Sequence, residues 1–112
     1  MLSRPNRLTR GVDYRAVVRG GRRCGGSHTV TYVAATGGDR APRFGFIVSK
    51  QVGGAVARNT VRRRLKALCA EALGDVASGA DVVIRALPSA ATAPYAELRT
   101  EVRRCLAKRA AT

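Results

Sequence analysis

Apolar positions along the chain follow two alternating periods, one helical and one extended. Segments with helical spacing predict helices, and runs rich in β-branched and aromatic residues predict strands. Glycine clusters and Pro88 separate these segments. The predicted helices cover 9–19, 55–73 and 92–109, and the predicted strands cover 28–35, 43–49 and 81–87.

The order of these segments predicts an α+β protein with the element order α-β-β(-β)-α-β-α. We expect a two-layer α/β sandwich in which the helices cover one face of the sheet. The turn Gly37-Gly38-Asp39 predicts an antiparallel hairpin between strands 28–35 and 43–49. A length of 112 residues predicts a single domain over 1–112.

Charge narrows the choice of partners. The chain has 21 Lys and Arg against 7 Asp and Glu, a formal net charge of +14. Such a charge opposes compaction unless a polyanion neutralises it, which favours a nucleic acid and, less strongly, a membrane surface. No apolar run approaches the roughly 20 residues of a membrane span, and the N-terminus lacks a signal peptide. We therefore predict a cytoplasmic protein.

The three cysteines are far apart, form no Cys-x-x-Cys pair and are accompanied by one histidine. This spacing indicates neither a zinc site nor a disulfide framework. Cys69 and Cys105 fall on apolar helix faces and are expected in the core. Cys24 falls in a glycine-rich segment and is expected to be accessible, in a reduced protein.

The strongest candidate for a binding site is the segment 49–66, which contains six basic residues and no acidic one. On a helical wheel, its apolar stripe continues to residue 72 and consists of Val61, Leu65, Leu68, Cys69 and Ala72. The opposite side carries Asn59, Arg62, Arg63 and Lys66, flanked by Arg58 and Arg64. The plain alternative is a solvated basic face. Like charges repel at this spacing, however, so an external anion is expected to compensate them.

The run from Lys50 to Leu65, with its Gly-x-Ala-Val-x-Arg-Asn core, resembles the signature of the protein subunit of bacterial ribonuclease P. The resemblance continues in Asn6-Arg7-Leu8, Asp13-Tyr14, Phe44–Lys50 and Asp81–Arg85. The chain departs from the family pattern at three positions. Thr60 replaces a usual Arg, Tyr14 replaces Phe, and Val18 replaces a second aromatic residue.

The resemblance implies a fold with a left-handed βαβ crossover through the basic helix, against the usual right-handed rule. It also implies a ribonucleoprotein endoribonuclease that removes the 5′ leader of precursor tRNA. Catalysis would belong to a large RNA subunit and its Mg²⁺ ions, so that no active site lies on the protein. The partners would be ribonuclease P RNA and precursor tRNA, and the protein itself would be monomeric.

The resemblance also assigns the family's RNA-binding roles to the matching positions of this sequence. Contacts with the catalytic RNA would come from Lys50, Arg58, Asn59, Arg62, Arg63 and Lys66. The leader cleft would contain Tyr14, Val18, Tyr32 and Phe44, because aromatic platforms beside cations bind single-stranded RNA. Core packing is the alternative for Tyr32 and for Phe44. Phe46 shares a strand face with Phe44 and is expected in the core. The only metal role is for Asn59, which would help to order a metal-bound phosphate.

Other classes of function fit the residues less well. The acidic residues are scattered, and His28 alone cannot act as both general acid and general base, so a nuclease active site on the protein is not expected. A ribosomal-type structural RNA-binding protein is the main alternative. A duplex DNA-binding module lacks a helix-turn-helix partner. A membrane-surface helix lacks Trp and Phe anchors.

Overall fold

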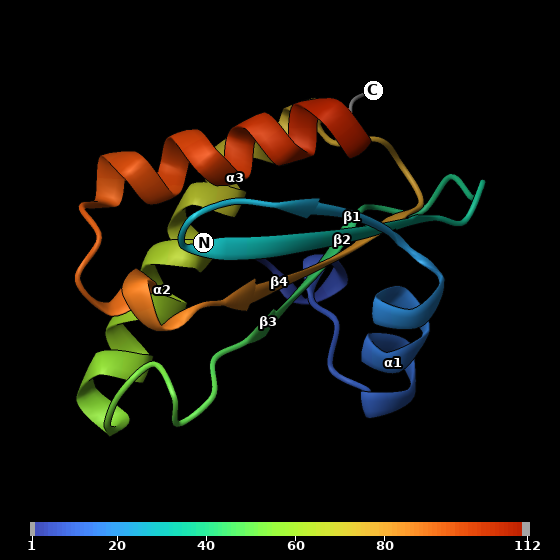
Figure 1. The fold of residues 1–112 in the computed structure, drawn as a ribbon. Helices are drawn as coiled ribbons and strands as arrows, with labels where there is room; N and C mark the ends of the chain where they lie inside the picture. Colours follow the sequence, from blue (N-terminus) through green and yellow to red (C-terminus); the bar gives the residue numbers. More distant parts are fainter. Residues whose placement is uncertain (1, 111–112) are drawn as a thin grey trace.

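The computed structural model describes residues 2–110 and contains one four-stranded sheet and three α-helices (Figure 1). The elements are α1 (Gly11–Gly20), β1 (Arg22–Gly25), β2 (Thr29–Ala35), β3 (Arg43–Ile47), α2 (Ala55–Ala72), β4 (Ala80–Ala86) and α3 (Tyr95–Arg109). Short 3₁₀ helices cover Arg4–Asn6, Leu73–Asp75 and Pro88–Ala91. This order confirms the predicted α+β class, including an additional strand before the second long helix. Within residues 2–110 no helix is long and apolar enough to cross a membrane.

The strand order in the sheet is β1-β2-β4-β3. β4 pairs antiparallel with β2 and parallel with β3. The predicted hairpin between strands 28–35 and 43–49 is therefore wrong, because β4 lies between them. Consecutive residues Val82, Val83 and Ile84 of β4 are all fully buried. A strand can bury consecutive side chains only where both faces of the sheet are covered, which favours the central position for β4.

The hairpin partner of β2 is β1, a short strand that the hydrophobic pattern did not predict. Its turn is closed by the Gly26 N–H, which donates to the Thr29 carbonyl at 2.9 Å. β1 has only four residues and buries only one of them, Cys24, so it lacks the alternation that marks a longer strand.

The parallel strands β3 and β4 are connected through α2, since adjacent parallel strands cannot be joined by a tight turn. β3, α2 and β4 therefore form the expected βαβ unit. The left-handedness of this crossover stays a prediction.

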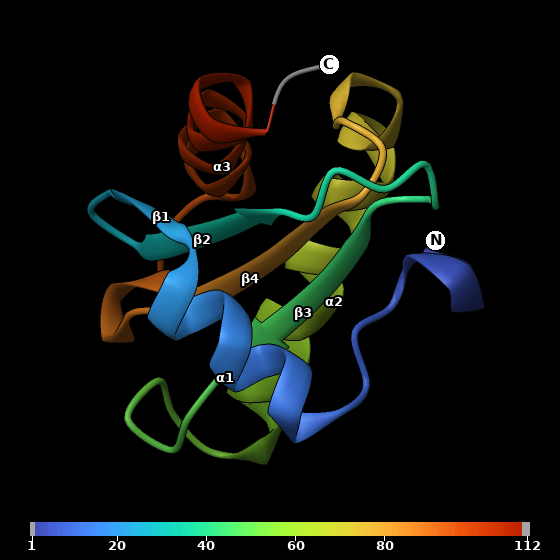
Figure 2. The ribbon, with the colours of Figure 1, turned by 90° about the vertical axis from the view of Figure 1, so that its right-hand side faces the viewer.

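Helices cover both faces of the sheet, as Figure 2 shows with α1 in front of the strands and α2 behind them. The larger core cluster joins Val82 and Ile84 to α2 and α3. A smaller cluster joins Val83 to Val17 of α1. The predicted sandwich is correct for the sheet with α2 and α3, but the expectation of a single covered face is wrong for α1. The cause is again β4, because Val83 needs cover on the other face.

The long helix α2 follows the helical-wheel prediction closely. Its buried residues are Val61, Leu65, Leu68, Cys69 and Ala72, which form the predicted apolar stripe. The helix begins directly after Gly53 and Gly54. Gly53 adopts φ 152°, and a Cβ there would lie 2.9 Å from the Ala57 Cβ, so this entry to the helix requires glycine. α2 thus presents its polar side away from the sheet.

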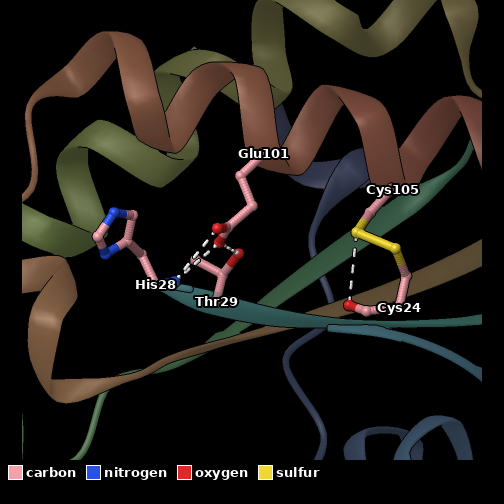
Figure 3. The surroundings of a disulfide bond; sticks show 5 residues. All are labelled: Cys24, His28, Thr29, Glu101 and Cys105. Atoms are coloured by element: carbon pink, nitrogen blue, oxygen red, sulfur yellow. Dashed lines mark hydrogen bonds between the residues drawn. A yellow bond between two sulfur atoms is a disulfide. The ribbon is translucent and has the colours of Figure 1, made fainter. Parts of the chain in front are cut away.

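Cysteine placement differs from the prediction. Cys24 lies in β1, is buried, and forms a disulfide with Cys105 of α3, with their Cα atoms 5.6 Å apart (Figure 3). Residues 81 positions apart in sequence can pair only because α3 packs over the β1–β2 hairpin, which the spacing did not reveal. One turn earlier on α3, Glu101 accepts hydrogen bonds from the Thr29 hydroxyl and the His28 N–H. Cys69 is a free, buried core residue, as predicted.

Candidate nucleic-acid interface

The exposed side of α2 carries a row of cations that have no acidic partner. Asn59, Arg63 and Lys66 are exposed, and Arg58 and Arg62 are half-buried. Ion pairs within residues 2–110 involve Arg40, Arg43, Arg99, Arg103 and His28, and none of them involves a cation of segment 50–66. We call Arg58, Asn59, Arg62, Arg63 and Lys66 the α2 basic face. Uncompensated charge at this density indicates a surface for a polyanion.

Hydrogen bonds hold part of this face in place. Arg62 donates to the Val48 carbonyl at 3.3 Å and to the Asn59 side-chain oxygen at 3.4 Å. The Nε of Arg58 is buried and has no hydrogen-bond partner within the described chain. Thr60 donates its hydroxyl to the Val56 carbonyl at 3.0 Å and so is engaged with its own helix. The α2 basic face therefore consists of Arg, Asn and Lys side chains, and the Thr60 hydroxyl is not part of it.

A groove lies on the opposite face of the sheet, between α1 and the strands. It has a volume of about 220 Å³ and is lined by Tyr14, Arg15, Val18, Arg19, Ile47 and Arg85, which we call the α1 groove. Arg85 is exposed and sits between Val30 and Ile47 in the strand register. Ile47 and Arg85 also line a second hollow of about 600 Å³ that reaches Lys50 in the loop before α2. The α1 groove is therefore continued by this hollow toward the loop that precedes α2.

Tyr14 is fixed by its surroundings. Its hydroxyl donates to the Leu8 carbonyl at 3.2 Å and accepts from the Phe46 N–H at 3.1 Å. The ring lies against Gly45, where an added Cβ would come within 2.5 Å of the ring carbon Cζ. A glycine at 45 is therefore needed for the ring to lie on β3.

The structure brings together only part of the predicted leader cleft. Tyr14 and Val18 line the α1 groove, and Tyr32 is buried in the cluster beneath them. Phe44 is only 1% exposed, packs in the larger core on the other face and does not line the α1 groove, so its place in a leader cleft stays a prediction. Phe46 was expected in the core but is partly exposed. Alternation places Phe44 and Phe46 on the same face of β3, and Phe46 packs against the same core cluster, which includes the buried residues of α2.

Sequence reasoning missed the cations of the groove, namely Arg15, Arg19 and Arg85. The signal at Arg85 was present as a single cation within an otherwise apolar run, Val82–Leu87. A charge in a central strand needs solvent or a partner, and residues 2–110 place no carboxylate within ion-pair distance of it. Only the strand register shows that Arg85 and α1 border the same groove.

His28 lies in a separate polar cluster near the start of α3. Its Nδ1 is 2.8 Å from the Ser89 hydroxyl, and its Nε2 is 3.0 Å from Glu97. Ser89 donates its only hydroxyl proton to the Ser27 carbonyl at 3.0 Å. This serine is therefore not poised as a nucleophile toward His28, and the cluster ties the β1–β2 turn to the 3₁₀ helix Pro88–Ala91 and the start of α3.

A small α+β fold with an unpaired cationic helix and a cation-lined groove defines a polyanion-binding protein. The sequence model of the family described as Ribonuclease P matches residues 2–110. The chain therefore belongs to the ribonuclease P protein family, whose members are components of a ribonucleoprotein endonuclease.

Individual relatives agree with this assignment. The ribonuclease P protein component of Acidothermus cellulolyticus is 44% identical over 109 residues, covering 96% of this chain and 91% of the relative. The ribonuclease P protein component of Clavibacter michiganensis is 50% identical over 103 residues, covering 91% of this chain and 90% of the relative. The solved Staphylococcus aureus RNase P protein superposes with a TM-score of 0.81 at 20% identity, covering 90% of this chain and 92% of that one. The Thermotoga maritima RNase P protein superposes with a TM-score of 0.81 at 20% identity, covering 91% of this chain and 96% of that one. At this identity the structural likeness supports the fold alone.

Proposed function

We propose that this chain, as a ribonuclease P protein subunit, binds the catalytic RNA with the α2 basic face and the 5′ leader of precursor tRNA in the α1 groove. The observation that carries the proposal is a family-matched helix whose cations have no acidic partner within residues 2–110. The matches reported above give no support to the alternative of a structural ribosomal protein.

Contact with the catalytic RNA uses Arg58, Asn59, Arg62, Arg63 and Lys66, with Lys50 at the adjoining loop. Arg58 has no carboxylate within ion-pair distance among residues 2–110, which leaves its charge uncompensated and supports this assignment. Phosphate oxygens are suitable acceptors for such guanidinium groups.

The leader is assigned to the α1 groove on the basis of its composition. Tyr14 and Val18 supply a partly exposed apolar wall, and Arg15, Arg19 and Arg85 supply cations. Single-stranded RNA is bound by this combination of stacking surface and positive charge. Tyr32 supports the wall from below, and Phe44 has no part in this groove.

The α2 basic face does not fit a resident Mg²⁺. Mg²⁺ prefers carboxylate, carbonyl and water oxygens, whereas the Asn59 oxygen is occupied by Arg62 and lies in a row of cations. Within residues 2–110 no three His, Cys, Asp or Glu side chains are grouped to hold a metal. We therefore assign the Mg²⁺ of the reaction, and the hydrolysis itself, to the RNA subunit. Asn59 is limited to a phosphate contact.

The test is cleavage of a 5′-extended precursor tRNA by the cognate catalytic RNA at low Mg²⁺, with and without this protein. We expect strong stimulation that grows with leader length. The proposal is contradicted if the protein binds the catalytic RNA tightly but does not stimulate cleavage.

Single variants separate the two surfaces. Arg63→Gln should weaken binding of the catalytic RNA and lower the magnitude of its logarithmic salt slope by roughly one unit, whereas Arg104→Gln on the exposed side of α3 should change neither. Arg85→Gln should weaken the binding of a substrate with a leader about tenfold, because a charged hydrogen bond is lost. The binding of a substrate without a leader should not change. Equal losses for both substrates would remove Arg85 from the leader site.

A further inference from the structure

Another hollow, separate from the two already described, lies at the outer edge of β3, between the N-terminal segment and α2. Its volume is about 500 Å³, within the roughly 300–1,000 Å³ range of ligand pockets. The residues that matter for its chemistry are Arg7, Leu8, Tyr14, Phe46, Arg62 and Lys66. Among these, only Tyr14 also borders the α1 groove. The hollow is therefore distinct from the proposed leader site.

This β3 hollow combines an aromatic wall with a cationic rim. Phe46 and Tyr14 are each partly exposed, so their rings offer surface to a ligand. Arg7, Arg62 and Lys66 stand around them, and none has a carboxylate within ion-pair distance among residues 2–110. No acidic residue lines the hollow. The composition suits a planar apolar group that carries negative charge.

Two of the cations are held in place before any ligand arrives. Arg7 donates from Nε and Nη2 to the Leu2 carbonyl at 3.0 and 2.9 Å, which leaves Nη1 without a partner among residues 2–110. Arg62 is held by the Val48 carbonyl and Asn59. Ordered guanidinium groups lose less conformational entropy on binding, so these two can contact a phosphate at low cost.

We propose that the β3 hollow binds one unstacked nucleotide of the catalytic RNA, with its base against Phe46 and its phosphate among Arg7, Arg62 and Lys66. Stacking on an aromatic ring beside cations is a general means of holding an unpaired nucleotide. The inference rests on the proposed function, because Arg62 and Lys66 also belong to the α2 basic face. This shared location assigns the nucleotide to the catalytic RNA and not to the precursor tRNA.

The free protein provides the first test, by NMR amide shifts on addition of AMP, adenosine or inorganic phosphate at constant ionic strength. AMP should shift the Leu8 and Phe46 amides more than either fragment alone. Phe46→Leu keeps an apolar side chain at this position. It should weaken the binding of AMP about fivefold and leave the binding of phosphate unchanged. Lys66→Gln should weaken both. Lys108→Gln, the matched loss of an exposed lysine on α3, should weaken neither. AMP shifts no larger than those of phosphate, or shifts elsewhere only, would overturn the assignment.

The RNA provides the second test. Phe46→Leu should weaken binding of the catalytic RNA without changing its salt slope, because a stacked base releases no counterions, whereas Lys66→Gln should flatten the slope. If wild-type protein binds the RNA and Phe46→Leu binds it equally well, only the nucleotide site fails. If wild-type protein does not bind the RNA, the proposed function itself fails. A loss confined to precursor tRNA would overturn the assignment to the catalytic RNA.

Discussion

Asp81, at the start of β4, is a carboxylate that two arginines hold against the sheet. Its side chain is only 9% exposed. Arg43 donates to both of its oxygens at 2.9 Å, and Arg40 donates to it at 3.1 Å. Burial alone would raise the pKa of Asp81, but the hydrogen bonds and charges of Arg43 and Arg40 outweigh burial and hold the pKa below its usual value. This residue joins the loop before β3 to β4.

The lowered pKa predicts a pH-dependent contribution to stability. The ionised Asp81 stabilises the folded state fully above the ordinary Asp pKa of about 3.9. This stabilisation is lost as the pH falls through the lowered pKa that Asp81 has in the folded protein. Asp81→Asn should therefore lower the free energy of unfolding by about 1.5–3 kcal/mol at neutral pH, and the difference should shrink as the pH falls below the ordinary Asp pKa of about 3.9. Urea denaturation across this range measures it, with the exposed Asp39→Asn as control. A penalty that stays constant with pH would contradict the assignment.

Single residues were predictable where helical periodicity determines their position. The five residues of the α2 stripe are buried as predicted, because their spacing alone places them on one side of a helix. Sequence reasoning assigned Arg85 no role and did not place Phe44 outside the α1 groove, since the surroundings of both residues depend on which strands and helices lie beside them. The alternation showed that Phe44 and Phe46 share a face but gave no indication of which helix covers that face.

At the scale of elements, the long helices and strands follow from local patterns, but their pairing does not. The residues of β1 were not predicted, and the place of β4 between β2 and β3 depends on contacts between residues far apart in sequence. The same holds for the contact between the β1–β2 hairpin and α3, where the Cys24–Cys105 disulfide lies.

The disulfide predicts a stability that depends on redox conditions. Closing a loop between residues 81 positions apart restricts the unfolded chain, so reduction should lower the free energy of unfolding by about 2–4 kcal/mol. Urea denaturation with and without dithiothreitol measures this difference. The Cys24→Ser/Cys105→Ser variant serves as the control, because the reductant should not affect it. Equal stability of the wild-type protein under both conditions would contradict the prediction.

At the scale of the whole molecule, positive charge is distributed over more than one surface. A net charge of +14 is carried by 112 residues. The α2 basic face, the α1 groove and the rim of the β3 hollow all hold cations without acidic partners within residues 2–110. Self-repulsion of this kind opposes the compact state of the free protein.

Anions should therefore stabilise the free protein. We expect the melting temperature to rise by about 5 °C or more when sodium chloride is raised from low to near-physiological concentration, because salt screens the repulsion. Pyrophosphate should give the same rise at a much lower concentration, since it binds the cations directly. Differential scanning calorimetry measures both effects. A melting temperature independent of salt and of pyrophosphate would contradict this view.

The two edge strands of the sheet affect whether copies of the chain can associate through their backbones. An open sheet exposes unpaired backbone groups at its edge strands, which invites strand addition and aggregation. At one edge, the Leu8 N–H donates to the Phe44 carbonyl at 2.8 Å, so the N-terminal segment covers part of β3. At the other edge, β1 has only four residues and carries the exposed Arg22 and Arg23. Shielding at one edge, and brevity with charge at the other, leave little template for edge-to-edge polymerisation.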